Sequence, residues 1–315
     1  MKYILSDARL ALRAWRKSPG FTAIALLSIA LGIGANAAIF TLVDQVLLRV
    51  LPVRDPHELV QVTFSGNRFG SNWGDGSELS YPVYTELRDN NQVFSGMFVR
   101  FGYSFHIGHG GRTERVAGEI VSGSYFPVLG VGAAIGRTLT MEDDRLPGAH
   151  PVAVLSYGFW VSAFGRDPSV VNSTLTINGH PYTVVGVARQ GFDGIEVGRP
   201  AAVFVPMMMK AQLTPGWNAL DERLYRWVKV FGRLAPGVSA DQALASLSPL
   251  YKSSIDADLK DPEFLRAAAQ TRERYAANQL QIVPAAQGRS GFRRAMTTPL
   301  WVLMATAAGV RSCVP

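Results

Sequence analysis

The chain has 315 residues, of which 48% are hydrophobic and only 17% are charged, and its formal net charge is +7. The basic residues gather near the two ends beside apolar segments, a pattern that favours an anionic lipid surface and argues against nucleic-acid binding. The single cysteine, Cys313, excludes an intramolecular disulfide, so a folded region must be stable through its apolar core alone.

Residues 1–18 predict an amphipathic basic helix on the cytoplasmic surface of a membrane. At helical spacing, Leu5, Ala8 and Leu12 share one face, and the arginines fall on another. Such a helix lies in the interface with its basic side chains near lipid headgroups. The expected membrane-surface anchors are Arg9, Arg13, Trp15, Arg16 and Lys17.

Residues 21–48 predict a transmembrane helix. No charged residue occurs from Thr22 to Val43, a run longer than the roughly 20 residues that cross a bilayer core of about 30 Å. A signal peptide has a shorter apolar core of about 7–15 residues, so a cleaved signal is a weaker alternative, as is a buried helix of a soluble protein. Ser18, Pro19 and Gly20 are expected to break the chain before the span.

Small residues recur along one face of this predicted span. Ala30, Gly34 and Ala38 are spaced four residues apart and would let a second helix approach closely. The alternative is that glycine is simply common in membrane helices. These three residues are the helix-packing candidates of the chain.

The charges on either side of the span predict its orientation. Basic residues outnumber acidic ones in residues 1–18, whereas the two kinds are balanced directly after the span. The chain is expected in the inner (cell) membrane. The positive-inside rule then places its N-terminus in the cytoplasm. Residues 49–297 are then extracytoplasmic.

The region after the span predicts an α+β domain, because strands and helices alternate along it. Strands are expected at 59–64, 93–105 and 115–121, and helices at 81–91 and 124–130. From about Gly136 the chain is richer in strands, with the clearest signal in TLTINGHPYTVVGV. There, Asn178-Gly179 supplies the tight turn of a β-hairpin.

Further elements complete this region. Strands are expected at 151–155, 202–205, 226–234 and 280–283, and helices at 156–165 and 240–251, with Ser156 and Ser239 as their caps. Residues 252–278 are expected to be helical or mobile. The apolar run 298–310 is too short to cross a bilayer, so it predicts a second transmembrane helix that is cut off in a truncated or fragmentary chain.

The sequence predicts no catalytic, cofactor-binding or metal-binding residues. It contains no P-loop, GxSxG or HExxH motif. His106 and His109 have no third ligand nearby and are expected in a loop. Residues 141–145 are expected to form an exposed acidic turn, and Met207–Met209 to pack as ordinary apolar side chains.

Three stretches carry a family resemblance: KSPGFTAIALLSIALGIGANAAIFTLVDQVLLRVLPVRDPHELV, GRLAPGVSADQALA and PLWVLMATAAG. They resemble an ABC transporter permease of the MacB and FtsX-like type, and more narrowly the long duplicated permeases of acidobacteria. The resemblance implies a MacB-like periplasmic core domain at 49–290. Within it, a porter-like part would occupy 49–135 and 211–290, and an inserted, mostly β part would occupy 136–210.

The resemblance also implies a mechanism in which the permease hydrolyses nothing. A separate ATP-binding subunit would drive a permease homodimer, whose membrane helices pass the motion to the extracytoplasmic domains by mechanotransmission. The unfinished second helix departs from the family pattern and puts transport by this chain alone in doubt. The alternatives are a single-pass membrane protein whose extracytoplasmic domain binds or scaffolds without transport, and an extracytoplasmic enzyme.

Overall fold

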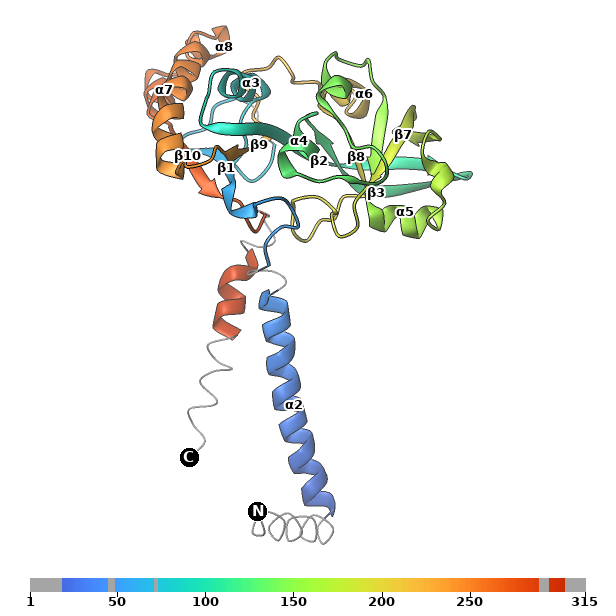
Figure 1. Ribbon diagram of the computed structural model, residues 1–315. Helices are drawn as coiled ribbons and strands as arrows, with labels where there is room; N and C mark the ends of the chain where they lie inside the picture. The colour runs from blue at the N-terminus through green and yellow to red at the C-terminus, as the bar shows by residue number, and fades with distance from the viewer. Residues whose placement is uncertain (1–18, 45–48, 71–72, 289–294, 304–315) are drawn as a thin grey trace. The chain divides into compact units, whose positions relative to one another are not determined.

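One long apolar helix and one ten-stranded sheet dominate the computed structural model, which describes residues 19–44, 49–70, 73–288 and 295–303 (Figure 1). The chain divides into two compact units. The helical unit comprises Met1–Arg49 with Phe292–Pro315, and the sheet unit comprises Val50–Gly291. The predicted surface helix at 1–18, with its anchors, lies outside the described residues.

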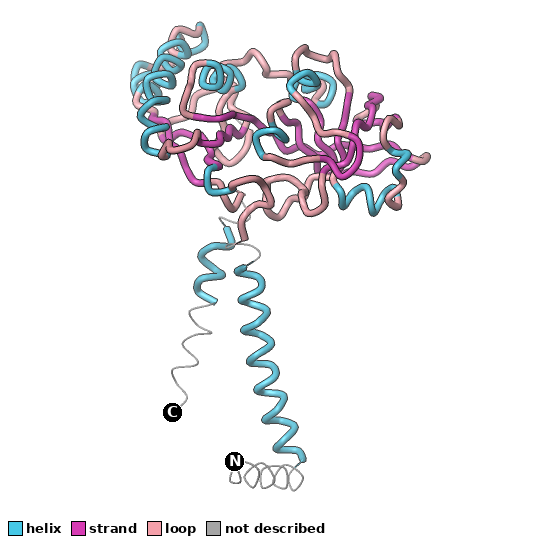
Figure 2. The backbone as a smooth tube through the Cα atoms, viewed as in Figure 1, coloured by secondary structure: helices cyan, strands magenta, loops and turns pink. Residues whose placement is uncertain are grey.

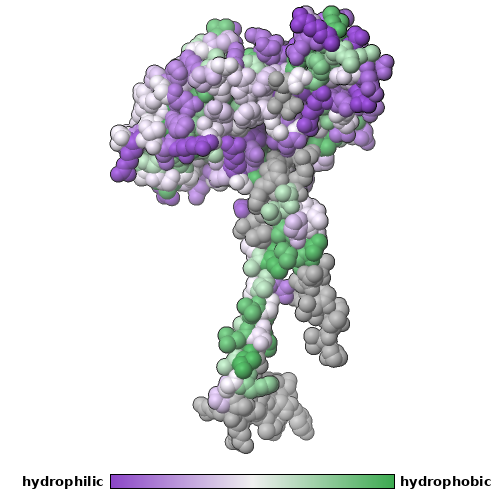
Figure 3. Space-filling model, turned by 180° about the vertical axis from the view of Figure 1, so that it is seen from behind, coloured by the Kyte–Doolittle hydropathy of each residue, from purple (hydrophilic) through white to green (hydrophobic). Residues whose placement is uncertain are grey.

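Helix α2, Pro19–Val43, is apolar around its whole circumference, and its side chains are largely exposed (Figure 3). Among the described residues it is the one helix long and apolar enough to cross a membrane. The expected break at Ser18–Gly20 is wrong in one respect, because the helix already includes Pro19 and Gly20. A proline fits in the first turn, where its missing N–H has no helical partner to lose.

The helical unit has a small apolar cluster of its own. Ile39 and Val43 of α2 pack against Met296 and Leu300 of the helix 295–303. The face with the helix-packing candidates stays exposed within this unit, and nothing lies within 4 Å of a Cβ built at Gly34. The packing role of Ala30, Gly34 and Ala38 therefore stays a prediction.

The sheet unit contains one mixed sheet with the strand order β10-β1-β9-β2-β3-β8-β5-β7-β4, and β6 pairs with both β2 and β7. Most neighbours are antiparallel, but β3–β8 and β5–β7 are parallel pairs. The strands are β1 Leu59–Ser65, β2 Phe94–His109, β3 Arg112–Val121, β4 Ala133–Gly136, β5 Val152–Leu155, β6 Thr174–Ile177, β7 His180–Ala188, β8 Val203–Pro206, β9 Lys229–Leu234 and β10 Gln279–Pro284.

Six of these strands close into a ring, β2-β3-β8-β5-β7-β6, because β6 returns to pair with Ile107 and Gly108 near the end of β2. Strand β2 therefore belongs both to the ring and to the open layer β10-β1-β9. The sheet runs without a break through the predicted boundary at residue 136, since β3 pairs with β8. The division of 49–290 into porter-like and inserted parts stays a prediction.

Helices flank the sheet at several places (Figure 2). The longest, α7 Ala240–Asp258, packs against β10 and against α3 Tyr81–Asp89. The shorter helices are α4 Tyr125–Leu129, α5 Tyr157–Phe164, α6 Lys210–Leu213, α8 Pro262–Leu265 and α9 Ala269–Ala276, with 3-10 turns η2 Pro56–Glu58, η3 Met141–Asp144, η4 Pro168–Val170 and η5 Met207–Met209.

Local signals in the sequence are confirmed at the element ends. The Ser156 side chain accepts a hydrogen bond from Phe159 N–H, and Ser239 forms a capping box with Gln242. The β6–β7 turn has positive φ at both central residues, 49° at Asn178 and 85° at Gly179, as a two-residue hairpin of this kind requires. The sequence predicts residues 252–278 as either helical or mobile, and within them Pro262–Leu265 and Ala269–Ala276 form the helices α8 and α9.

Apolar side chains fill both faces of the sheet. One large cluster occupies the inside of the ring and extends beneath α3 and α7, with Phe105, Tyr182 and Trp227 among its fully buried members. A second cluster lies on the other face, where Phe98 stacks on Phe231 at a ring distance of 5.2 Å. Met207–Met209 are buried in the first cluster, consistent with the expected packing role.

Candidate functional site

Strand β2 lacks a neighbouring strand along part of one edge, in the region of the sheet unit that the structure describes. On this edge β9 pairs with β2 only as far as Arg100, which lies opposite Lys229. Strand β6 takes over at Ile107, which lies opposite Ile177. The edge of β2 between these two points is left open.

Main-chain groups of β2 point into this gap. Both the N–H and the C=O of His106 face the gap, because the N–H donates to the Asn178 side chain at 2.8 Å and the C=O accepts from Asn178 N–H at 2.9 Å. In an antiparallel strand alternate residues turn their main chain to the same edge. The polar groups of Gly102 and Ser104 therefore face the gap as well.

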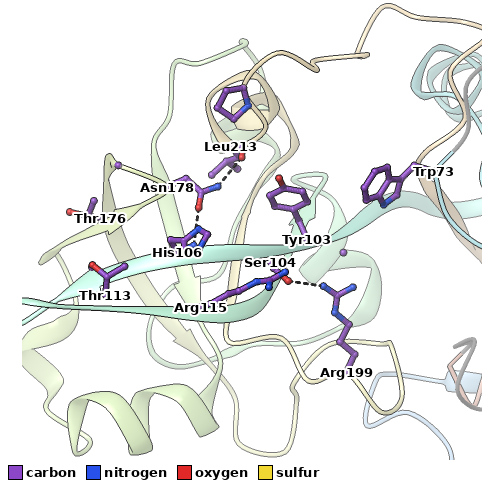
Figure 4. A pocket seen from close by; sticks show the side chains of 14 residues that line it. Trp73, Tyr103, Ser104, His106, Thr113, Arg115, Thr176, Asn178, Arg199 and Leu213 are labelled. Atoms are coloured by element: carbon purple, nitrogen blue, oxygen red, sulfur yellow. Dashed lines mark hydrogen bonds between the residues drawn. The ribbon is translucent and has the colours of Figure 1, made fainter.

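A cavity of about 800 Å³ occupies the gap (Figure 4). Its floor is β2 with the start of β3, and one wall is β6 with the β6–β7 turn. The rest comes from the end of α6, the chain just after it, and the segments around Trp73 and Arg199. The lining residues are Trp73, Gly102, Tyr103, Ser104, His106, Gly108, Thr113, Arg115, Thr176, Asn178, Gly179, Arg199, Leu213 and Pro215.

Asn178 fixes the wall of this cavity. Besides its bonds to His106, its side-chain Nδ2 donates to the carbonyl oxygen of Leu213 at 2.8 Å. One residue in the left-handed conformation thus ties the hairpin turn to β2 and to the end of α6. The wall is therefore preorganised, since the Asn178 side chain bonds to two other segments, β2 and the end of α6.

Two arginines give the cavity a positive charge. Arg199 donates to Ser104 Oγ at 3.3 Å, and the Arg115 side chain has no hydrogen bond or ion pair within the described residues. No aspartate or glutamate is among the described residues that line this cavity. Most of the donors of the two planar guanidinium groups are free to bind an anion.

Aromatic rings form the opposite side of the cavity mouth. Figure 4 shows Trp73 and Tyr103 on one side of β2 and Arg115 and Arg199 on the other. The Trp73 ring is 52% exposed, and it stacks on Trp217 at a ring distance of 5.6 Å. Its main-chain N–H donates to Arg226 C=O at 2.9 Å, so the exposed ring stands on an anchored segment.

A smaller cavity of about 220 Å³ adjoins the first and shares Trp73, Gly102 and Arg199 with it. Its base is an ion cluster in which Arg100 lies 3.1 Å from Glu119 and 2.5 Å from Glu196. Arg100 and Glu119 are both almost fully buried. The cluster joins β2 and β3 to the loop that carries Arg199.

The buried carboxylates of this cluster respond differently to their surroundings. Burial raises the pKa of Glu119 and repulsion by Glu196 adds to this effect, whereas the attraction of Arg100 opposes it without offsetting it. Burial also acts on Glu196, but there Arg100 outweighs it and the pKa is lowered. The Tyr125 hydroxyl donates to Glu119 at 2.9 Å and fixes its carboxylate.

The two histidines singled out in the sequence are placed differently from expectation. His106 and His109 lie on β2 and not in a loop, and the turn that follows is Gly110-Gly111. Only His106 lines the cavity. No cluster of three His, Cys, Asp or Glu side chains suited to a metal occurs in the parts of the chain that the structure describes.

The expected exposed acidic turn at 141–145 is wrong for two of its residues. Asp143 is buried and pairs with Arg137 at 2.6 Å, and it forms a capping box with Thr140. Asp144 accepts hydrogen bonds from the main-chain N–H groups of Gly123 and Met208 at 3.0 and 2.8 Å. Burial raises the pKa of Asp144 to about 6 despite these bonds.

Sequence reasoning missed the residues that form the cavity. Trp73, Arg115 and Arg199 come from segments far apart in the chain, and nothing local marks them. One signal was present in β2, where polar residues at Gly102, Ser104 and His106 alternate with apolar ones. That alternation indicates a strand with one polar face, although not what covers it.

Comparison with known proteins connects this unit to one family. Residues 22–250 match the family described as the MacB-like periplasmic core domain. No curated protein matches the sequence significantly.

Two solved structures share the fold at low identity, and a third has a lower score. The periplasmic region of MacB from Actinobacillus actinomycetemcomitans has 17% identity and a TM-score of 0.50, over 72% of this chain and 89% of that one. A domain of a proposed permease protein from Porphyromonas gingivalis has 14% identity and a TM-score of 0.51, over 79% and 99%. The extracellular domain of the noncanonic ABC-type transporter YknZ from Gram-positive bacteria has 13% identity and a TM-score of 0.48, over 71% and 99%.

Proposed function

The chain belongs to the family of the MacB-like periplasmic core domain, and we propose that it is the permease component of an ABC-type exporter. The observation that carries this proposal is the extent of the family match. It begins at residue 22, inside the apolar helix, and continues through most of the sheet unit to residue 250. One continuous match thus covers a membrane anchor and the extracytoplasmic domain that it holds.

In the finer parts of the proposal, the orientation follows the charge pattern and the protein partners follow the family resemblance. The N-terminus lies in the cytoplasm, and residues 49–297 lie outside the inner membrane. The partners are a separate ATP-binding subunit, a second copy of the chain in a homodimer, and membrane lipid. The permease itself carries no catalytic residues, and ATP hydrolysis by the partner supplies the energy for transport.

The first and last segments of the sheet unit support a role in mechanotransmission. They meet each other, since Leu51 N–H donates to Ala286 C=O at 2.8 Å. The buried Arg233 of β9 donates to the carbonyl oxygens of Val128 and Asp55 at 2.9 Å each, and also to that of Arg54. A movement of residues 50–58 would therefore also move β9, because hydrogen bonds from Arg233 join the two segments directly.

Co-purification tests the proposal. The full chain, tagged and solubilised in mild detergent, should bring down an ATP-binding ABC subunit from its own cells, with a stoichiometry of two permease copies per complex. Omitting the tag provides the control for background binding. Recovery of the chain without any ATP-binding protein would contradict the exporter assignment and favour the alternative of an extracytoplasmic domain that binds or scaffolds without transport.

A further inference from the structure

We propose that the 800 Å³ cavity binds a small organic acid, in which a carboxylate or sulfonate is attached to a flat ring. The proposal concerns binding by this chain alone and goes beyond the export function. It rests on three features of the cavity, namely its two guanidinium groups, its exposed indole and the open strand edge between them.

The charge on the cavity selects an anion. Arg115 has no partner within the described residues. Arg199 donates to the Ser104 hydroxyl and is attracted by Glu196 of the adjoining cavity, but Glu196 is already paired with Arg100. Guanidinium groups bind planar carboxylates and sulfonates through paired N–H donors. A neutral or cationic occupant would leave these donors without an acceptor and would lose their hydration.

The opposite side of the cavity selects a flat apolar ring. Trp73 exposes half of its indole, and Trp217 supports the ring from behind at 5.6 Å. Tyr103 stands beside it on the same side of β2 (Figure 4). A ring stacked on Trp73 would bury apolar surface at little entropic cost, because the indole is already held in place.

The open edge of β2 connects the two sides. Ser104 lies on β2 between the aromatic side and the arginine side (Figure 4), and Gly102 lies two residues before it on the same strand. Gly102 leaves the open edge of β2 free of a side chain. A Cβ at this position would lie only 2.8 Å from the Arg100 guanidinium. An occupant can thus cross the edge, with its ring on Trp73 and its acid group on Arg115 and Arg199.

Calorimetric titration of the full chain in detergent with 2-naphthalenesulfonate tests the proposal, with empty micelles as the reference. We expect saturable binding to one site per chain. Arg115→Gln and Arg199→Gln should each raise Kd by about tenfold, and Trp73→Ala should raise it several-fold. Methanesulfonate, which has the acid group without the ring, should bind much more weakly.

Arg112→Gln provides the matched control, because it removes the same charge from the same strand on the face that does not line the cavity. It should leave Kd unchanged. The proposal is overturned if 2-naphthalenesulfonate shows no saturable binding, or if Arg115→Gln and Arg199→Gln bind it as well as Arg112→Gln does. Binding of an extended tripeptide in place of the sulfonate would overturn it too, and would assign the edge to a peptide. The titration contains no ATP-binding subunit, so its result is independent of the co-purification.

Discussion

Lys210 is fully buried, and within the described residues it has no carboxylate as an ion-pair partner. Its ammonium group lies 3.4 Å from the centre of the Trp217 ring and 4.8 Å from that of Trp227. It donates to Thr214 Oγ1 at 2.5 Å and to the Trp217 carbonyl oxygen at 2.7 Å. Burial lowers the pKa of Lys210 to about 7, because aromatic faces replace only part of the lost hydration.

Lys210→Met should change how stability depends on pH. The unfolded lysine binds a proton up to its ordinary pKa of about 10.4, whereas the folded one releases it near pH 7, so the wild-type free energy of unfolding should rise between these values by up to about 1.4 kcal/mol per pH unit. The methionine variant should lack this rise. Denaturant titrations of the full chain in detergent at pH 7 to 10 would measure it.

Lys260→Met removes an exposed lysine and serves as the control. It should keep the pH dependence of the wild type. Parallel pH profiles for the wild type and Lys210→Met would show that the folded lysine keeps its proton across this range.

At the scale of elements, the long strand β2 determines the shape of the sheet unit. Its first residues, up to Arg100, pair with β9, and Ile107 and Gly108 near its end pair with β6, while β3 pairs with it along the other edge. The ring closes only where β6 reaches β2. The turn that follows β6 is held in place by Asn178, so a single side chain secures this closure.

Asn178→Gly should loosen the ring. Glycine adopts the positive φ of this turn without strain, but it removes the side-chain bonds to His106 N–H and to the Leu213 carbonyl. The free energy of unfolding should fall by about 1–3 kcal/mol, and the amide hydrogen of His106 should exchange faster.

Asn172→Gly is the matched control for this change. Asn172 also has a positive φ, 68°, but its side chain forms no hydrogen bond within the described residues. The glycine there carries the same backbone entropy cost without the loss of bonds. Equal destabilisation by both variants would show that the Asn178 side chain does not secure the ring.

At the scale of the whole molecule, the apolar helix and the sheet unit have surfaces suited to different surroundings. The side chains of α2 are exposed although they are apolar, with Phe21 and Leu31 each 76% exposed. Leaving such a surface in water is unfavourable, so the helix requires a bilayer or other helices around it. The sheet unit has its own buried core and its own internal ion pairs.

Cysteine labelling can determine the topology of the chain. In a Cys313→Ser background, Glu114→Cys on the exposed tip of the β2–β3 hairpin should react with a membrane-impermeant maleimide in spheroplasts. Lys2→Cys should react only after the membrane is permeabilised. The reverse pattern would contradict the proposed orientation and place the sheet unit in the cytoplasm.

Much of the fold could be predicted from local patterns. The hydropathy of residues 22–43 identified the membrane helix, because crossing a bilayer depends on length and composition. Ser156, Ser239 and the Asn178-Gly179 turn were found because caps and hairpin turns depend on residues within a few positions of one another. The anchored α+β architecture followed from these signals together, whereas the family was found from its resemblance to three longer stretches of the sequence.

The candidate site depends on contacts that no local pattern contains. Arg199 meets Ser104 across 95 positions of the chain, and Asn178 meets His106 across 72. Asp144 is a charged residue in a turn, which usually means exposure, yet it accepts hydrogen bonds from the main chain of Gly123 and Met208, 21 and 64 positions away. The sequence by itself determined the anchor, the elements and the class of fold, whereas only the tertiary structure decided where β2 is left open, because strand pairing between remote segments sets that edge.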